Sequence, residues 1–216
     1  ASIPLRGQFV VDVGANVGEL SELFWRGGAA RVLSVEPLHE NVERLRRRIA
    51  QLGATNWEVE ACAVTGADGP AQLRVSREGG GIDNCVVVRG QGDRTVPGRR
   101  LSALAPAAEV VKLDVEGHEY AILDEALARM ERVHTWALEL HMAPGRPLER
   151  TLTALSQQGF RLRAAGRRPG DPSGAWQGFE IPPSLSWDRI PVAHTRADGS
   201  VFKMVHVLAQ RAGAGA

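Results

Sequence analysis

The segment Phe9 to Gly18, FVVDVGANVG, constrains the fold of this chain more than any other stretch. An apolar run ends at Asp12, and the chain then turns through Gly14 and Gly18 into a helical pattern. Glycine tolerates positive φ angles and lets a ligand approach the backbone closely. The first amide groups of the helix also point into the turn. The pattern predicts a strand, a turn and a helix that together seat a nucleotide-like cofactor; a tight turn without a ligand is the alternative.

The spacing within this turn narrows the choice of cofactor. A dinucleotide fingerprint requires G-x-G-x-x-G, whereas this chain has Asn16 in place of the middle glycine and no glycine at position 19. A nicotinamide-dependent oxidoreductase is therefore disfavoured. A second buried strand, Arg31 to Glu36, ends in an acid that Pro37 follows. Because an acid at this place in a βαβ unit accepts hydrogen bonds from ribose hydroxyls, we expect Glu36 to bind a ribose.

Composition limits the possible partners and compartments. With 216 residues, the chain is expected to form a single domain, 1–216. Its 26 basic and 25 acidic side chains and its 5% aromatic content give no reason to expect nucleic acid or an anionic membrane as a partner. It has neither an apolar stretch of about 18 residues nor a basic segment followed by an apolar core near the first residue. We therefore expect a cytoplasmic protein, with Cys62 and Cys85 as free buried thiols. The oligomeric state stays open.

Predicted strands and helices alternate along most of the chain, which indicates an α/β layered fold with a mostly parallel sheet. A loop rich in glycine, Glu78 to Asn84, interrupts the alternation. The predicted strands after the second are Asn56–Val64, Ala71–Val75, Val110–Val115, Thr135–Leu140 and Phe160–Ala164, and the predicted helices are one that ends at Gly53, Tyr120–Met130 and Pro147–Gln157.

The last part of the chain breaks this rhythm. The segment 165–200 contains five prolines and no clear period. A loop of this length inside a compact domain is usually functional, and we expect it to be a lid or a substrate-binding segment. Val201 to Ala209 follows as a final strand, which we expect to be antiparallel to its neighbour because no crossover helix precedes it.

Acids and imidazoles gather after two neighbouring predicted strands. Ligands of open α/β sheets bind beyond the carboxyl ends of the strands, so these side chains are expected to meet Asp12 and Glu36 at one edge. Like charges at such an edge need a cation, a proton or a ligand to hold them together. Lys112 is expected either to pair with one of the acids or to reach the strand end. The residues concerned are Asp114, Glu116, His118 and Glu119 after one strand, and Glu139 and His141 at the end of the next.

Five sequence elements together resemble the FkbM-type family of S-adenosylmethionine-dependent methyltransferases, over roughly Phe9 to Phe160. They are DVGANVG, VEP at 35–37, Asn41 with Leu45, ACAV at 61–64 and, above all, KLDVEGHEYAIL at 112–123. The resemblance implies a Rossmann-like class I methyltransferase fold, in which a seven-stranded, mostly parallel sheet has an antiparallel last strand and helices on both faces. It also implies S-adenosylmethionine as the cofactor. The residues implied to contact this cofactor are Asp12, Gly14, Asn16, Gly18, Glu36, Pro37, Ala63 and Asp114.

Members of this family mostly methylate hydroxyl oxygens, so the resemblance implies O-methylation of a small metabolite or sugar. A neutral alcohol must lose its proton, and histidine titrates closest to neutral pH. His141 is the preferred base because it ends a strand beside Glu139. The other catalytic candidates are His118, Glu139 and Glu116, and Glu116, Glu119 and Glu139 are expected either to orient the histidines or to act directly. Structurally satisfied histidines are the alternative.

Three further alternatives stay open. Asp114, Glu116, Glu139 and His141 are ligand types that suit magnesium or manganese, but we expect no metal because the resemblance does not require one. The second alternative is a nicotinamide-dependent oxidoreductase. The third is a binding module that retains the cofactor pocket without turnover.

Overall fold

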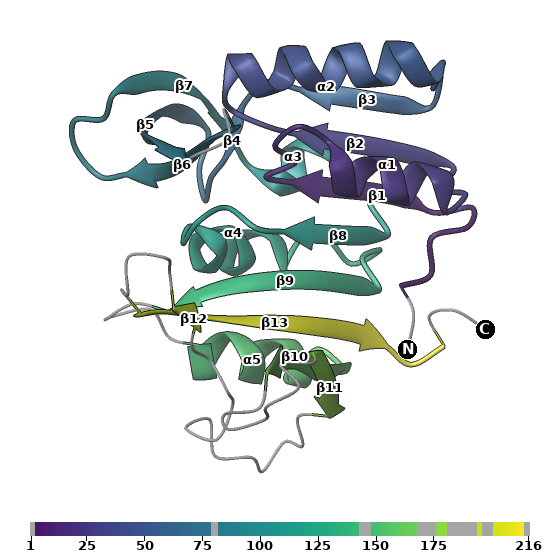
Figure 1. Ribbon diagram of the computed structural model, residues 1–216. Coiled ribbons are helices and arrows are strands. Elements are labelled where there is room, and N and C mark those ends of the chain that lie inside the picture. Colours follow the sequence, from purple (N-terminus) through teal and green to yellow (C-terminus); the bar gives the residue numbers. More distant parts are fainter. Residues whose placement is uncertain are drawn as a thin grey trace.

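The structure, a computed structural model, describes residues 3–78, 82–142, 148–167, 176–180, 194–195 and 201–213. Among the described residues, its main sheet contains nine strands. Seven of them lie in the order β3, β2, β1, β8, β9, β13, β10, from top to bottom in Figure 1, and the short strands β11 (Trp176–Glu180) and β12 (His194–Thr195) extend the sheet beside β10 and β13. The bounds of the seven are β1 Phe9–Val13, β2 Arg31–Val35, β3 Trp57–Glu60, β8 Val110–Leu113, β9 Thr135–Met142, β10 Phe160–Arg167 and β13 Val201–Arg211.

Strand directions in this sheet follow the predicted pattern. The neighbours from β3 to β9 pair in parallel, whereas β13 pairs antiparallel with both β9 and β10. The predicted mostly parallel sheet with an antiparallel last strand is thereby confirmed. The central strands are mostly apolar because helices pack on both faces of the sheet, and the exceptions in β1, β2 and β8 are Asp12, Arg31, Ser34 and Lys112. In β1, for example, the last four residues are buried.

The segment 165–200 contains more regular structure than predicted. Residues 165–167 continue β10, β11 (Trp176–Glu180) pairs antiparallel with β10, and β12 (His194–Thr195) pairs with β13. These pairings widen the sheet at the β10 side. The rest of the predicted lid, 168–175, 181–193 and 196–200, lies outside the described residues.

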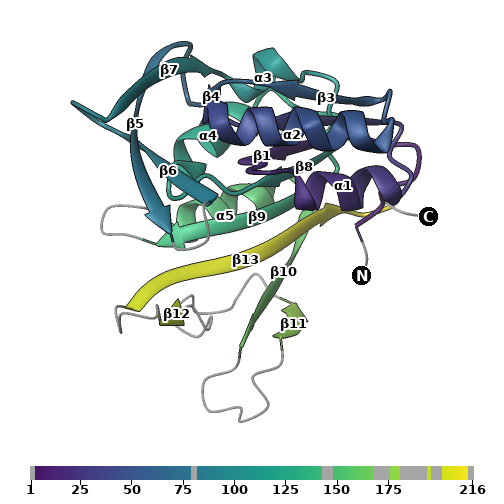
Figure 2. The ribbon, with the colours of Figure 1, turned by 45° about the horizontal axis from the view of Figure 1, so that its top comes forward.

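Helices form a layer on each face of the main sheet (Figures 1 and 2). On one face, α1 (Glu19–Arg26) and α2 (His39–Leu52) pack through Phe24 and Leu45 against the strands. On the other face lie α3 (Leu101–Leu104), α4 (Glu119–Ala126) and α5 (Leu148–Gln157), and their side chains join the largest apolar core. The prediction of helices on both faces is confirmed.

A second, four-stranded sheet was not predicted. Its order is β4 (Ala63–Val64), β7 (Arg94–Arg99), β5 (Gly69–Glu78) and β6 (Ile82–Val88), and it lies beyond the carboxyl ends of β1 and β2 (Figure 1). The predicted strand Asn56–Val64 was wrong as one unit, because β3 ends at Glu60 and the chain passes into this second sheet. The predicted glycine-rich loop is largely the antiparallel β5–β6 hairpin, in which Glu78 pairs with Ile82. Residues 79–81 are not described.

Several element ends differ from the predictions. Helix α4 ends at Ala126, and the residues up to Met130 form turns in which the Met130 amide still donates to the Ala126 carbonyl. Strand β8 ends at Leu113, because the chain leaves the sheet at Asp114. Strands β9, β10 and β13 run two or three residues further than predicted, since each pairs with a neighbouring strand along its added length. Pro147 lies outside the described residues.

The structure also bears on two expectations that were based on composition, the state of the cysteines and the presence of a membrane-spanning helix. Both cysteines are free; Cys62 is buried as predicted, whereas Cys85 is only half-buried. Among the described residues, no helix has the length and apolar character needed to cross a membrane.

Candidate functional site

Gly14 and Gly18 shape the turn after β1, because each lets another part of the protein pack closely against the backbone of the turn. Gly14 has a φ of +76°, and a Cβ atom there would lie 1.8 Å from the carbonyl oxygen of Asp114. Gly18 caps α1 with a φ of +83°, and a Cβ atom there would lie 3.0 Å from Cγ of Leu45. Gly14 lines both of the cavities described below and Gly18 lines neither, and the contact of Gly18 with the cofactor stays a prediction.

Asp12 lies beneath this turn and is fully buried. The hydroxyl of Ser21 donates to its Oδ2 at 2.5 Å, Ser34 donates to Ser21 at 2.7 Å, and the Trp57 indole donates to Ser34 at 2.8 Å. We call these four residues the Asp12 chain. Asp12 lines neither cavity, and its contact with the cofactor stays a prediction. The Asp12 chain joins β1, α1, β2 and β3 below the turn.

Lys112 on β8 closes the Asp12 chain at its other end. Its Nζ lies 3.2 Å from Oδ1 of Asp12 and donates to the carbonyl of Gly14 at 2.9 Å. It also lies 3.6 Å from Oδ2 of Asp114. Burial lowers the pKa of Lys112, but the carboxylates of Asp12 and Asp114 outweigh this and raise the pKa above its usual value. The predicted pairing of Lys112 with an acid is confirmed.

A small cavity of about 110 Å³ lies between the turn, the end of β2 and the second sheet. Glu36 lines it and is almost fully buried. Its carboxylate accepts hydrogen bonds from the amides of Asn16 at 2.9 Å and Leu38 at 3.0 Å, and burial raises its pKa. The structure also brings the predicted residues Pro37 and Ala63 to this cavity.

The second sheet supplies a wall of the small cavity that the sequence analysis missed. Leu73 of β5 and Cys85 and Val87 of β6 line it opposite Glu36. Leu73 lay in the predicted strand Ala71–Val75, whereas no strand was predicted for Cys85 and Val87, although apolar residues alternate there. Burial raises the pKa of the Cys85 thiol to about 12, so this thiol is an apolar wall residue and not a nucleophile.

A larger cavity of about 690 Å³ adjoins the small one, and the two share Gly14, Asn16 and Asp114 in their walls. Its floor is the face of the main sheet beside α1. Apolar side chains supply much of its wall, and charged groups stand at the carboxyl end of the strands. The floor residues with polar side chains are Lys112, Glu139, Arg163 and His206.

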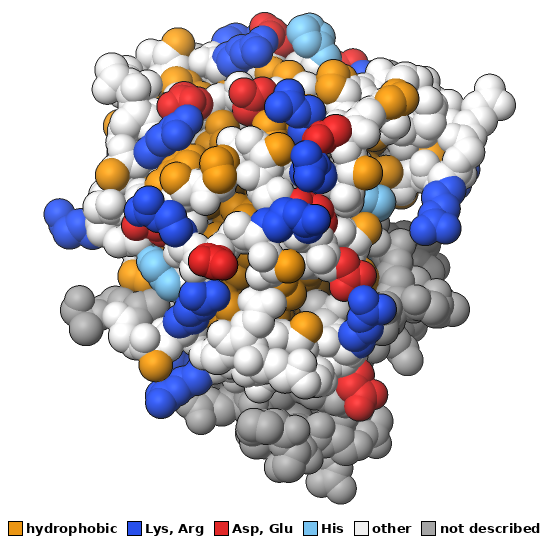
Figure 3. Space-filling model, turned by 180° about the vertical axis from the view of Figure 1, so that it is seen from behind, with side chains coloured by type: hydrophobic (Ala, Val, Ile, Leu, Met, Phe, Trp, Pro, Cys, Tyr) orange, Lys and Arg blue, Asp and Glu red, His pale blue; other side chains and the backbone are white. Residues whose placement is uncertain are grey.

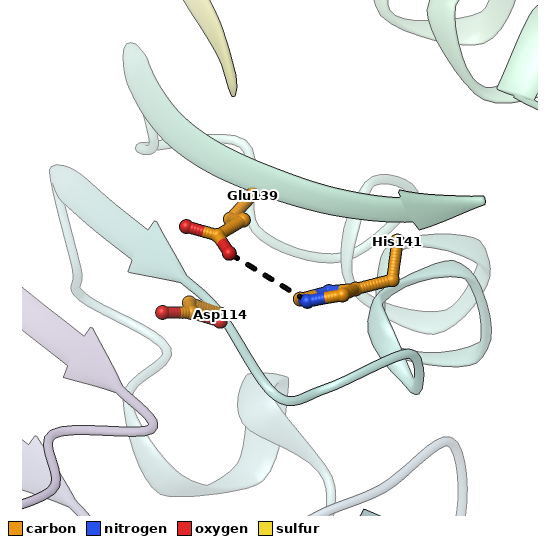
Figure 4. Close-up of side chains that lie close together, drawn as sticks. All are labelled: Asp114, Glu139 and His141. Carbon is orange, nitrogen blue, oxygen red and sulfur yellow. Dashed lines mark ion pairs between the residues drawn. The ribbon is translucent and has the colours of Figure 1, made fainter. Parts of the chain in front are cut away.

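At this end of the sheet, acids surround His141 of β9 (Figure 4). Its Nδ1 lies 3.0 Å from Oε1 of the fully buried Glu119, which also accepts hydrogen bonds from the Gly117 and Val115 amides. Its Nε2 lies 3.4 Å from Glu116 and 3.6 Å from Glu139. We call Asp114, Glu116, Glu119, Glu139 and His141 the acid–imidazole cluster.

Opposing effects set the pKa values in the acid–imidazole cluster. Burial, and next the charge of Asp114, raise the pKa of Glu139 to about 7. Burial lowers the pKa of His141, but Glu119 and the other carboxylates raise it more. Burial also opposes ionisation of Glu119, yet the contact with His141 holds the pKa of Glu119 below its usual value. The cluster therefore holds exchangeable protons near neutral pH, as acid–base catalysis requires.

Two other histidines, one that was predicted to be catalytic and one that was not considered, also bear on the description of the site. His118 caps α4 and lines neither cavity. His206 of β13, which the sequence analysis missed, lies opposite Glu139 in the sheet, and its Nδ1 is 3.6 Å from Oε2 of Glu139. His206 lies in the last strand, which was predicted to be antiparallel. Residue periodicity alone, however, does not reveal which strand pairs with it.

Known structures share this fold. A methyltransferase FkbM from Methylobacillus flagellatus KT superposes with a TM-score of 0.54 at 18% identity, over 81% of this chain and 44% of the other. A Streptococcus pneumoniae protein described as a tRNA (m1A22) methyltransferase, in complex with S-adenosyl-L-methionine, superposes with a TM-score of 0.50 at 14% identity, over 95% of this chain and 67% of the other. The chain thus spans less than half of the FkbM structure. These similarities show the class I methyltransferase fold.

The sequence itself gives the family. The chain has no significant match among curated proteins. The family model for the methyltransferase FkbM domain, however, matches residues 12–162, which is more than half of the chain and includes both the turn after β1 and the acid–imidazole cluster. The chain therefore belongs to the FkbM methyltransferase family.

Proposed function

We propose that this protein transfers the methyl group of S-adenosylmethionine to a hydroxyl oxygen of a small metabolite or sugar. The observation that carries the proposal is the meeting of two cavities at Gly14, Asn16 and Asp114. The small cavity presents the buried carboxylate of Glu36, and the large one presents Asp114 and Glu139 of the acid–imidazole cluster. A cofactor in one and an acceptor in the other would meet at the shared wall.

The small cavity fits the nucleoside part of the cofactor. Glu36 offers a carboxylate to ribose hydroxyls, and its orientation is fixed by the amides of Asn16 and Leu38. Pro37, Ala63 and the apolar wall from the second sheet suit a flat base. When bound, S-adenosylmethionine supplies an electrophilic methyl group. The carboxylates of Asp114 and Glu139 near the shared wall favour a positively charged sulfonium.

The large cavity fits the acceptor. Methyl transfer requires an oxygen positioned about 3 Å from the methyl carbon, in line with the bond that breaks. The acid–imidazole cluster provides hydrogen-bond acceptors for the hydroxyl and a route for its proton. Of the predicted catalytic residues, His141, Glu139 and Glu116 lie in this cluster, and we assign the activation of the hydroxyl to it.

We propose a small-molecule acceptor in preference to a nucleic acid. Three acidic residues, Glu19, Asp114 and Glu139, line the large cavity and would repel phosphate groups. On the face that α3, α4 and α5 cover, basic and acidic side chains are interspersed (Figure 3). We further propose that the segment 165–200 contributes to acceptor binding, because β11 pairs with β10 and Arg163 of β10 lines the large cavity.

Thermal unfolding with added ligands tests the cofactor assignment, since only a ligand of the native state raises the melting temperature. We expect S-adenosylmethionine and S-adenosylhomocysteine to raise it and NAD to have no effect; the reverse would establish the oxidoreductase alternative. Hydroxylated acceptors are then incubated with methyl-labelled cofactor, and the product is identified by mass spectrometry and NMR. A methyl group on nitrogen or carbon would contradict the assignment to oxygen, and cofactor binding without any product would favour a non-catalytic module.

A further inference from the structure

We propose that the acceptor of the large cavity is a hydroxy acid with an apolar body, whose carboxylate pairs with Arg163 while its hydroxyl lies beside Asp114 and Glu139. The observation that carries this inference is an arginine on β10 that lines the cavity without a described counter-charge. The inference rests on the proposed function, because it names the class of acceptor for the same cavity.

The floor of the large cavity is a face of the main sheet that the described helices leave largely open. On this side α1 and α2 pack against β1, β2 and β3, whereas α4 and α5 pack against β9 and β10 on the other side (Figure 1). Along β10 and β13, buried and partly exposed residues alternate, and the partly exposed Arg163, His206 and Leu208 line the cavity. This part of the floor is therefore available to a ligand.

Strand register places Arg163 and Glu139 on this same face but at separate points. Arg163 pairs with Leu208 of β13, and Leu208 pairs with Ala137 of β9, two residues before Glu139. Directly paired residues, and residues two apart on one strand, project from the same face of a sheet. With strands about 4.8 Å apart and a rise of about 3.3 Å per residue, the Cα atoms of Arg163 and Glu139 lie about 12 Å apart.

The charge of Arg163 is not balanced within the described part of the cavity. The two other basic side chains of the cavity lie near acids, Lys112 at 3.2 Å from Asp12 and His206 at 3.6 Å from Glu139. No described side chain forms an ion pair or a hydrogen bond with the guanidinium of Arg163. Arginine stays charged throughout the physiological range, and its planar donors match a carboxylate in a bidentate contact. A partly buried guanidinium of this kind favours an anionic ligand.

The walls between the two ends of the cavity define the body of the acceptor. Most of the wall is apolar, with contributions from Ala15, Val17, Leu20, Ala137 and Leu208. A ring or a short carbon chain buries such a surface, whereas a sugar would leave hydroxyl groups unpaired against it. Each polar group of the acceptor lies about 3 Å from its protein partner, so about 12 Å between the two ends leaves roughly 6–9 Å between hydroxyl and carboxylate.

The acids of the cavity do not oppose a carboxylate at Arg163. Glu139 is about 12 Å away, which exceeds the Debye length of about 8 Å at physiological ionic strength, so its repulsion is largely screened. Asp114 follows β8, one strand further from β10, and Glu19 is exposed at the start of α1. A nucleic acid would bring phosphates to both ends of the cavity, whereas a single carboxylate reaches only the basic end.

Calorimetric titration with hydroxy acids and their amides tests the pairing in the presence of S-adenosylhomocysteine. The probes are 4-hydroxybenzoate, 4-hydroxyphenylacetate and 3-(4-hydroxyphenyl)propanoate, each compared with its carboxamide. We expect at least one acid to bind about ten- to hundredfold more tightly than its amide, as for a hydrogen bond to a charged group. Arg163→Gln should abolish this preference, and Arg163→Lys should retain part of it. Arg161→Gln is the matched control, since Arg161 is an exposed arginine of β10 that lines neither cavity, and it should keep the preference.

Selectivity for charge distinguishes a ligand contact from a structural one. The backbone of Arg163 pairs with that of Glu180 on β11, and a purely structural role between these strands predicts that Arg163→Gln weakens the binding of acid and amide alike. That result overturns the inference, and so do three acids that bind no better than their amides. Circular dichroism confirms that each variant is folded.

The reaction separates this inference from the proposed function. Methyl transfer to the amides as fast as to the acids overturns the role of Arg163 while the proposed function stands. Binding of an acid through Arg163, in a protein that transfers no methyl group to oxygen, would overturn the proposed function and leave the carboxylate site intact.

Discussion

Two groups of charged side chains lie a few residues apart at the same edge of the main sheet, and they differ in how their charges are satisfied. In the Asp12 chain, a fully buried carboxylate has Ser21 on one oxygen and Lys112 beside the other. In the acid–imidazole cluster, three partly exposed carboxylates and the buried Glu119 surround His141, and two of the carboxylates, Asp114 and Glu139, line an open cavity.

This difference distinguishes charged residues that support the fold from charged residues that are available to react or to bind a ligand. A buried ion pair with internal partners fixes the position of backbone, here the turn at Gly14, but offers nothing to a ligand. A cluster with an excess of one charge retains capacity to bind a proton, a cation or a substrate. Sequence position alone did not distinguish them, because Asp12 and Asp114 both follow apolar strands. The four changes below test the distinction, from the largest expected effect to the smallest.

Replacing Lys112 with methionine is expected to have the largest effect on stability. It leaves Asp12 buried without its counter-charge, and breaking such a pair costs about 3–5 kcal/mol of the free energy of unfolding. Urea denaturation followed by circular dichroism measures the loss. Lys112→Arg retains the charge and should lose less. If Lys112→Met unfolds at the same urea concentration as the original chain, Lys112 does not support the turn as we describe.

Replacing His141 with glutamine is expected to affect turnover instead. Loss of a positioned group of this kind lowers turnover about 10²–10⁴-fold. The affinity for S-adenosylmethionine should stay nearly unchanged, because His141 does not line the small cavity that contains Glu36. Initial rates and calorimetric titration measure the two quantities. His118→Gln is the control, since His118 lies at the start of α4 outside both cavities, and it should retain most of the turnover. Equal losses in the two variants would remove His141 from the reaction.

Replacing Glu36 with glutamine is expected to weaken cofactor binding specifically. Hydrogen bonds to a charged group contribute about 1.5–3 kcal/mol, which corresponds to roughly a ten- to hundredfold higher dissociation constant for S-adenosylmethionine. Turnover at saturating cofactor should fall far less. Calorimetry on the variant measures this, with Glu60→Gln, an exposed acid at the end of β3, as the control. An unchanged dissociation constant would mean that the small cavity does not hold the ribose.

The same contrast explains what the sequence predicted well. Parallel strands buried on both faces leave uninterrupted apolar runs, so β1, β2, β8 and β9 were predicted almost in place. Their carboxyl ends meet at one edge, which is why Glu36, Asp114, Glu139 and His141 were predicted to converge.

Other features depend on contacts that no local pattern records. The second sheet has exposed charged residues such as Arg74 and Arg99 along its strands, so periodicity did not separate all of these strands from loops. The proximity of His206 to Glu139 depends on which strands are neighbours. The role of Asp12 in supporting the fold depends on its hydrogen bond with Ser21, which lies nine residues later in the sequence on α1.

That last contact gives the smallest of the four effects. Ser21→Ala removes the donor to Oδ2 of Asp12 and the acceptor for the Ser34 hydroxyl, but leaves the contact between Asp12 and Lys112 intact. Leaving a buried polar group without its partner costs about 1–3 kcal/mol, and a loss near the lower end is expected because Lys112 still balances the charge. Urea denaturation measures it, and Ser102→Ala, on α3, is a control for removal of a hydroxyl elsewhere. The combined variant with Lys112→Met is the sharper measurement. Because both changes act on one carboxylate, their losses should not add, whereas strictly additive losses would show that the Asp12 chain and Lys112 support the turn independently.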